Sequence, residues 1–237
     1  MSFSTNADSS TPRGGGPLLG TPTNVSEPAF EYLLSSMLHW VEQECEREHD
    51  KQQKELLDKK KEIANGSVDV DSNSEQEEND NDTSQRMVMI AENAAAKMER
   101  LGYDVGYRLI ERLAQNKPMA PSSSSSPNKQ TPAMIQLEAV KFICKEFWTE
   151  VFRKQIDKLQ TNHRGVFVLR DMQFKWLKRL PGDVEIARVM AIKILAFPCG
   201  LIRGALANLG IVAVVSCDFL ADGVNMSSCS FNVKVKG

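Results

Sequence analysis

The sequence predicts an α+β domain in which a helical layer of four to five helices packs on a small, twisted antiparallel sheet. Apolar residues recur with a helical period over most of residues 28–152 and with a period of two in several later segments. Helices that precede strands favour α+β over a repeating βαβ chain. With 237 residues, 41% of them apolar and 25% charged, the composition is that of a soluble protein of one or two domains.

The first predicted helix begins at Pro28 and continues to about Glu62. Its first part carries an apolar stripe at helical spacing, made of Phe30, Leu33, Leu34, Met37, Leu38 and Val41. Beyond Glu42 the stripe fades while Glu, Lys and Gln dominate. We therefore expect the second part of this helix to extend into solvent and fray.

A second helix is predicted over Met87–Gln115. Its apolar stripe comprises Met87, Ile90, Ala91, Ala94, Met98, Leu101, Val105, Leu109 and Leu113. Ala95, Gly102 and Gly106 lie along one edge of this stripe, although each glycine costs about 1 kcal/mol of helix propensity. Small residues at these positions indicate that another helix approaches closely.

A third helix is predicted over Ile135–Phe152, with apolar residues at helical spacing. Val166–Leu169, rich in β-branched and aromatic residues, predicts a strand. The residues expected to continue the sheet after it are Phe174, Trp176 and Leu180. Pro181-Gly182 is expected to end this part of the sheet.

A fourth helix is predicted from Asp183, an acceptable N-cap, to about Leu209. Gly210 follows at the position where glycine commonly closes a helix. Pro198 lies inside this segment, and we expect it to kink or break the helix because proline lacks the backbone N–H.

Two segments near the end of the chain, Ile211–Val215 and Phe231–Val235, predict a two-stranded hairpin. Residues 186–217 are hydrophobic enough to suggest a membrane span. However, no charge-free run reaches the ~18 residues that a span needs. The interrupting residues are Arg188, Lys193 and Arg203. We expect this segment to form the core.

We expect one domain over residues 28–237, preceded by a disordered tail (1–27) and interrupted by an acidic disordered insertion (64–85) and a Ser/Pro linker (116–133). The formal net charge of −2 hides an uneven distribution. Residues 42–85 carry 15 acidic and 6 basic side chains, and the rest of the chain carries 16 and 23. Residues 1–27 contain no apolar core of a signal peptide, so none is expected.

The chain contains no phosphate-binding loop, nucleophile elbow or zinc-binding helix motif. We therefore predict no enzymatic activity and no cofactor. Cys45 and His49, four residues apart on one helix, could supply two metal ligands, but zinc needs three or four, so no metal site is predicted. His39 is expected to be solvated, and His163 to have a structural role in a turn.

The five cysteines are odd in number and form no CxxC pair; they are Cys45, Cys144, Cys199, Cys217 and Cys229. This pattern indicates reduced thiols in a cytoplasmic protein. Cys144, Cys199 and Cys217 fall within apolar patterns, where a free thiol acts as a small buried hydrophobe. The alternative is a nucleophile or a lipidation site.

The basic excess of the body is modest and dispersed. Its two groups are Lys145, Arg153, Lys154 and Lys158, and Lys175, Lys178 and Arg179. Nucleic-acid binders concentrate charge more strongly and interleave it with stacking aromatics, so no nucleic acid is expected as a partner. A solvated face is the simplest interpretation, and a peripheral contact with anionic membrane lipids is the alternative.

Four segments carry a more specific signal than any of these patterns. They are 101–112 (LGYDVGYRLIER), 141–148 (KFICKEFW), 154–165 (KQIDKLQTNHRG) and 199–211 (CGLIRGALANLGI). In this order they resemble the small subunits of the TRAPP (transport protein particle) vesicle-tethering complex, and the subunit 6 branch in particular. The Gly-x-x-Arg-Gly-x-Leu motif resembles the part shared by the wider family, and we expect Gly200, Arg203 and Gly204 to have a structural role in it.

The resemblance implies a heterodimer with another TRAPP small subunit, typically of the subunit-3 type, inside a larger complex. That complex acts as an exchange factor for a Rab GTPase in ER-to-Golgi and intra-Golgi transport. It also implies a cytoplasmic location, peripheral at cis-Golgi and ER-derived membranes. The acylated cysteine of the subunit-3 branch cannot be carried over, because no cysteine lies between Cys45 and Cys144.

The leading hypothesis is a non-catalytic interaction subunit whose first two helices form the partner interface. The candidate interface residues are Leu34, Leu38, Met98, Gly102, Val105 and Leu109. On this hypothesis Gly102→Leu weakens heterodimer formation while the domain still folds. The same residues could instead face the core of their own domain. The rival function is a lipid- or acyl-binding module that uses Cys144 or Cys199 in an apolar groove.

Overall fold

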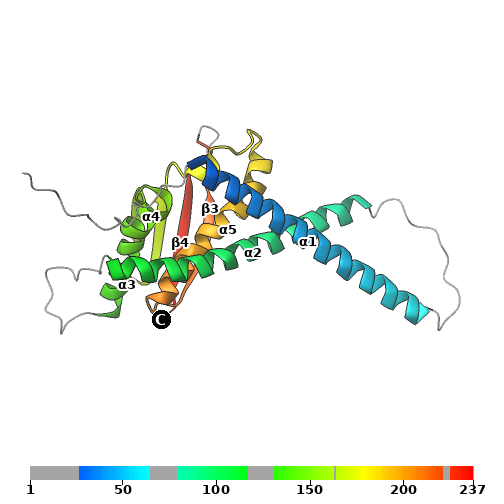
Figure 1. The fold of residues 1–237 in the computed structure, drawn as a ribbon, viewed down its shortest axis with the longest axis horizontal. Coiled ribbons are helices and arrows are strands. Elements are labelled where there is room, and N and C mark those ends of the chain that lie inside the picture. Colours follow the sequence, from blue (N-terminus) through cyan, green and yellow to red (C-terminus); the bar gives the residue numbers. More distant parts are fainter. Residues whose placement is uncertain (1–26, 65–78, 117–130, 163, 221–224, 237) are drawn as a thin grey trace, which may run out of the picture.

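The structure is a computed structural model that describes residues 27–64, 79–116, 131–162, 164–220 and 225–236. Its elements are α1 (Glu27–Ala64), α2 (Asn79–Asn116), α3 (Pro132–Phe142), the π-helical turn η2 (Ile143–Phe147), α4 (Trp148–Phe152), β1 (Lys158–Thr161), β2 (Val166–Asp171), the 3₁₀ turn η3 (Lys175–Leu177), α5 (Val184–Asn208), β3 (Ala213–Phe219) and β4 (Cys229–Val235). The helices form a layer against one antiparallel sheet, which confirms the predicted α+β class (Figure 1).

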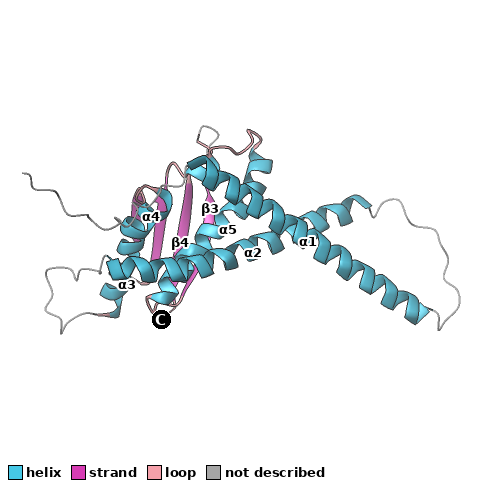
Figure 2. Ribbon diagram, in the orientation of Figure 1, coloured by secondary structure: helices cyan, strands magenta, loops and turns pink. Residues whose placement is uncertain are grey.

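The four-stranded sheet has the order β1-β2-β4-β3, and all neighbouring strands are antiparallel (Figure 2). In the centre of the sheet, Val233 of β4 lies opposite Phe167 of β2 and Val215 of β3, and all three are buried. Their neighbours Val214 and Lys234 are exposed. One face of the sheet therefore carries the core and the other faces solvent, as the period-two pattern of the strands requires.

The core between α4 and the sheet is aromatic. The rings of Trp148, Phe174 and Phe231 are fully buried, with centroids 5.3–6.2 Å apart. Trp148 donates its indole N–H to the Asp171 carboxylate at 3.1 Å, and the Lys154 ammonium lies 2.6 Å from the same carboxylate. Asp171 is completely buried, so these partners offset the loss of its hydration.

Helix α5 runs through the middle of the molecule. The Asp183 side chain caps it by accepting hydrogen bonds from the backbone N–H groups of Glu185 and Ile186 at 3.0 Å, as predicted. Gly210 has φ of +78° just beyond its C-terminal end. The helix continues across Pro198, so of the predicted kink or break, the break is wrong and the kink stays a prediction. Every residue from Leu195 to Ile202 is buried, and this packing stabilises the helix where the proline removes one hydrogen bond.

The segment after β2 also differs from the prediction. Phe174, Trp176 and Leu180 do not extend the sheet, because residues 175–177 form a 3₁₀ turn. Phe174 and Leu177 are both buried, and a spacing of three residues places them on the same side of such a turn. The apparent alternation of apolar residues here is therefore a feature of the turn.

Two helix boundaries lie earlier than predicted. Helix α2 begins at Asn79, eight residues before Met87, so the part of the predicted insertion from residue 79 to residue 85 is helical. The apolar stripe used to place this boundary starts only at Met87. Helix α3 begins at Pro132, where Thr131 accepts a hydrogen bond from the Met134 N–H. Residues 1–26 of the predicted tail, most of the insertion and linker, and His163 lie outside the described residues, whereas Glu27 is the first residue of α1.

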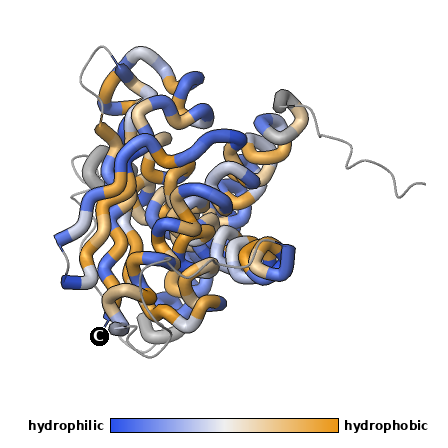
Figure 3. The backbone as a smooth tube through the Cα atoms, turned by 90° about the vertical axis from the view of Figure 1, so that its left-hand side faces the viewer, coloured by the Kyte–Doolittle hydropathy of each residue, from blue (hydrophilic) through white to orange (hydrophobic). Residues whose placement is uncertain are grey.

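Within the described residues, one helix, Val184–Asn208, is long and apolar enough to cross a membrane by length and composition. About 67% of its most apolar window is buried inside the molecule. The tube in Figure 3 shows hydrophobic segments gathered in the strands and the helices beside them. This burial identifies α5 as the core helix of the domain.

Candidate partner-binding surface

Helix α2 has one face locked against α5 of the same chain. A Cβ atom added at Gly102 would lie 2.1 Å from the backbone oxygen of Phe197, and one at Gly106 would lie 2.2 Å from that of Leu201. In the other direction, a Cβ atom at Gly200 or Gly204 would lie 2.0 or 2.1 Å from a backbone oxygen of α2. The two backbones are therefore in direct contact, and only glycine fits at these four positions.

Arg203 closes the exposed edge of this helix crossing. Its Nε lies 3.0 Å from Oε1 of Glu99, and its guanidinium carbon lies 5.0 Å from the centre of the Tyr103 ring. The motif residues Gly200, Arg203 and Gly204 thus all contact α2. In this chain the motif allows α5 and α2 to pack closely against each other.

Helix α1 contacts the body with fewer buried residues. Its buried apolar side chains are Leu34, Val41 and Cys45. Ion pairs connect it to the rest of the molecule: Glu31 to Arg179, Glu42 to Lys193, Glu48 to Lys97 and Asp50 to Arg86. From Asp50 to Lys61 every residue is exposed, and Figure 1 shows this half of α1 extending away from the sheet.

The two long helices expose large apolar side chains. These residues are Tyr32, Leu33, Trp40, Leu56 and Leu57 on α1, and Met87, Val88, Met89, Val105 and Tyr107 on α2. We call this set the long-helix surface. Trp40 is 56% exposed, and Leu33, seven residues earlier, shares its side of α1. Exposed aromatic and apolar residues on a helix are the usual anchors of a protein interface.

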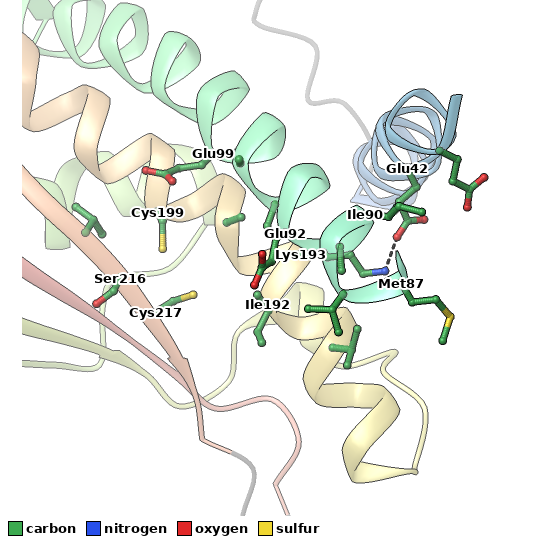
Figure 4. A pocket seen from close by; sticks show the side chains of 18 residues that line it. Glu42, Met87, Ile90, Glu92, Glu99, Ile192, Lys193, Cys199, Ser216 and Cys217 are labelled. Atoms are coloured by element: carbon green, nitrogen blue, oxygen red, sulfur yellow. Dashed lines mark hydrogen bonds and ion pairs between the residues drawn. The ribbon is translucent and has the colours of Figure 1, made fainter. Parts of the chain in front are cut away.

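A cavity of about 1,050 Å³ opens between α1, α2, α5 and β3 (Figure 4). Its lining is mainly apolar and includes Ile90, Ile192 and Ala196, with the thiols of Cys199 and Cys217 in its wall. Other residues that line it are charged: Glu42, Glu46, Glu92, Glu99 and Lys193. Trp40 lies two residues before Glu42 and therefore on nearly the opposite side of α1. The Trp40 side of α1 is thus separate from the cavity, whereas Met87 and Val88 of the long-helix surface line the cavity.

The structure separates the six predicted interface residues into three groups by their exposure. Leu34 and Met98 are buried in the core, and Gly102 is buried against α5. Leu38 and Leu109 are half-buried and pack against the core. Val105 is exposed by 46%. Most of these residues therefore contact their own chain, because a helical stripe marks an apolar face without identifying what covers it.

The exposed apolar residues of α1 and α5 were missed as interface candidates. On α5 they are Val184, Ile186, Val189 and Ile192. A signal for them was present, since Tyr32 and Trp40 are apolar residues outside the predicted stripe, and α5 is apolar on all sides.

The cysteines are free and mostly buried. Burial raises the pKa of Cys144 to about 12, and it also raises the pKa values of Cys45 and Cys229. Among the described residues, no group of three or more His, Cys, Asp or Glu side chains is placed to hold a metal ion. Cys45 is buried, and the ring of His49 contacts Asp50 at 3.9 Å.

Some side chains of the two predicted basic groups form ion pairs with acidic residues of the same chain. Lys154 pairs with Asp157 at 2.9 Å and with Asp171, and Arg179 pairs with Glu31 at 2.7 Å. Lys145 and Lys158 are exposed. The arrangement is a set of local ion pairs with a few solvated lysines between them.

A family model described as transport protein particle (TRAPP) component matches residues 30–236. The chain therefore belongs to the TRAPP component family, whose members are subunits of a vesicle-transport complex and are generally non-catalytic. Among known proteins, it is similar to trafficking protein particle complex subunit 6b of Danio rerio, with 39% identity over 141 residues that cover 60% of this chain and 78% of that protein. These comparisons confirm the resemblance predicted from the sequence motifs.

The human relatives give the same result. Subunit 6B of Homo sapiens is 40% identical over 140 residues, which cover 59% of this chain and 77% of that protein. Subunit 6A of Homo sapiens is 37% identical over 138 residues, which cover 58% and 76%. Among solved structures, TRAPP complex subunit 3 from Naegleria fowleri, covalently bound to palmitic acid, matches with a TM-score of 0.46 and 16% identity over 66% of this chain and 90% of that chain.

Proposed function

We propose that this chain is a non-catalytic TRAPP subunit that acts by forming a heterodimer with another TRAPP small subunit, especially one of the subunit-3 type. Its role is then to assemble the tethering and Rab exchange complex of ER-to-Golgi and intra-Golgi transport, and it acts on the Rab GTPase only through that complex. The corresponding location is cytoplasmic and peripheral at cis-Golgi and ER-derived membranes. Any direct membrane contact would use exposed lysines such as Lys145 and Lys158.

The observation that carries this proposal is the long-helix surface. Trp40, Leu33 and Val105 are exposed on helices whose other faces are already occupied by the chain's own core. Burial of such side chains contributes about 25 cal/mol per Å² of apolar area. A partner that covers them gains this free energy without any rearrangement of the core.

The test is co-purification with a subunit-3-type partner. Trp40→Asp and Val105→Asp place a charge within the proposed contact, and we expect each to weaken binding by about 30-fold, the loss of about 2 kcal/mol typical of a hot-spot residue. Val212→Asp is the matched control, because Val212 is 62% exposed just before β3 and outside the long-helix surface. Circular dichroism and thermal melting should show that all three variants fold.

Equal binding of the wild type and the two surface variants would show that the partner docks elsewhere. Loss of binding in Val212→Asp alone would move the interface to the β3 side of the molecule. Either result would overturn the assignment to the long-helix surface.

A lipid- or acyl-binding role is the second candidate, because the cavity between α1, α2, α5 and β3 is mainly apolar and large. Cys199 lines this cavity, whereas Cys144 is buried in the core and is not among the lining residues. The intact mass of protein purified from its native cells distinguishes the two roles. An added acyl mass on Cys199 would support the lipid role, and an unmodified chain that forms the heterodimer would support the proposed one.

A further inference from the structure

Two thiols meet in the wall of the cavity. Cys199 comes from the middle of α5 and is 4% exposed, and Cys217 comes from the edge strand β3 and is half-buried. Figure 4 shows their side chains directed toward each other from the two elements, and both line the cavity. A small polar reagent that enters the cavity therefore reaches both sulfur atoms.

The two thiols differ in character. The hydrogen bond from Cys199 lowers the pKa of Cys217, although burial opposes this effect. The same hydrogen bond, together with burial, raises the pKa of Cys199. Cys217 is also the more exposed of the two thiols, so a reagent in the cavity reaches it before the buried Cys199.

The other cysteines are placed differently. Cys229 lies opposite Phe219 in the β3–β4 pairing, whereas Cys217 lies opposite Phe231, so the two are displaced by two positions in the register. Diagonal neighbours of this kind are about 7–8 Å apart, beyond the usual reach of a disulfide. Cys45, Cys144 and Cys229 do not line the cavity, and burial raises the pKa of each.

We propose that Cys199 and Cys217 form a dithiol site that hydrogen peroxide entering the cavity oxidises reversibly. The Cys217 thiolate attacks one peroxide oxygen, the O–O bond breaks, and hydroxide leaves, which converts Cys217 to a sulfenic acid. The Cys199 sulfur then attacks the Cys217 sulfur, an S–S bond forms, and the sulfenic oxygen leaves as water with the Cys199 proton. The two thiols lose two electrons in total and the peroxide gains them. A small thiol such as glutathione reverses the reaction by exchange.

The disulfide would tie α5 to β3 across 17 intervening residues, 200–216. Both elements form walls of the cavity, so the bond would fix that side of the cavity. A disulfide between two elements lowers the conformational entropy of the unfolded chain. The oxidised protein should therefore melt at a higher temperature than the reduced one.

The experiment uses the full chain and hydrogen peroxide, followed by alkylation of the remaining thiols with N-ethylmaleimide and peptide mass mapping. We expect a Cys199–Cys217 cross-link with the loss of two hydrogen atoms, reversed by reduced glutathione. Cys199→Ser removes the second thiol, so dimedone should trap the sulfenic acid on Cys217 and the cross-link should be absent. Cys144→Ser is the matched control and should cross-link like the wild type.

Several results would overturn the assignment. One is preferential oxidation of Cys45, Cys144 or Cys229 in the wild type, and another is the absence of a dimedone label on Cys217 in Cys199→Ser. A third is alkylation of both cavity thiols at full yield after peroxide treatment. The first and third outcomes are read from the wild-type map, so they do not depend on the folding of the variants or on partner binding.

Discussion

Helix α2 makes two contacts of opposite kind with the rest of its chain. Against α5 its backbone touches another backbone at Gly102 and Gly106, so the two helices pack at close range and no side chain fits between them at these positions. Against α1 the contact consists of a few apolar side chains and the exposed ion pairs of Lys97 and Arg86. One side of α2 is a rigid part of the core, and the other carries a helix held by weaker interactions.

This difference explains how one helix can serve both folding and assembly. The α2–α5 contact excludes any side chain, so it cannot also serve as a surface for a partner. The α1 side exposes Trp40 and Leu33, whose burial would add stability to a complex. The stripe of small residues on α2 thus belongs to the core, and we propose that the interface lies among the exposed apolar residues beside it.

The largest expected effect is on the α2–α5 contact. Gly102→Leu should prevent folding or lower the free energy of unfolding by about 4 kcal/mol or more. The added atoms would clash with the backbone oxygen of Phe197, which, unlike a flexible side chain, cannot move without shifting the helix. Soluble yield and urea denaturation measure this effect. Gly182→Ala is the control, since a Cβ atom there meets nothing within 4 Å. The prediction that this variant loses only its partner is therefore replaced, and normal folding of Gly102→Leu would show that the helix crossing is looser than described.

The second effect concerns the buried carboxylate in the same rigid body. Asp171→Ala removes the acceptor of the Trp148 indole and leaves Lys154 without its 2.6 Å partner, so unfolding free energy should fall by about 3 kcal/mol. Urea denaturation measures the loss. Asp104→Ala, at an exposed position on α2, should change stability by no more than about 0.5 kcal/mol. A small effect at Asp171 would mean that the Trp148–Asp171–Lys154 network contributes little to the core.

The smallest effects are on the α1 contact. Lys193→Met breaks a partly buried ion pair with Glu42 and should cost about 1 kcal/mol. Lys97→Met breaks a more exposed pair with Glu48 and should cost no more than about 0.5 kcal/mol, and 1 M salt should reduce this further. Thermal melts at two salt concentrations measure both. Equal, large and salt-independent losses would contradict the description of α1 as weakly held.

The helices could be predicted from the sequence because their apolar residues follow a regular period. Val41 and Met98, both placed on predicted stripes, are fully buried. The 3₁₀ turn at Lys175–Leu177 could not be predicted, because Phe174 and Trp176 alternate as they would in a strand. The interface could not be predicted from periodicity either. Burial of Gly102 depends on which helix lies opposite, and the pairing of α2 with α5 joins residues almost 100 positions apart.

The most direct test of the central claim is hydrogen–deuterium exchange of the chain alone and bound to a subunit-3-type partner. If the long-helix surface is the interface, the peptides that contain Trp40 and Val105 should exchange more slowly in the complex. The centre of α5 around Phe197 should be protected equally in both states, because it is already buried. Protection confined to the exposed face of the sheet, around Val214, with α1 unchanged, would contradict the account.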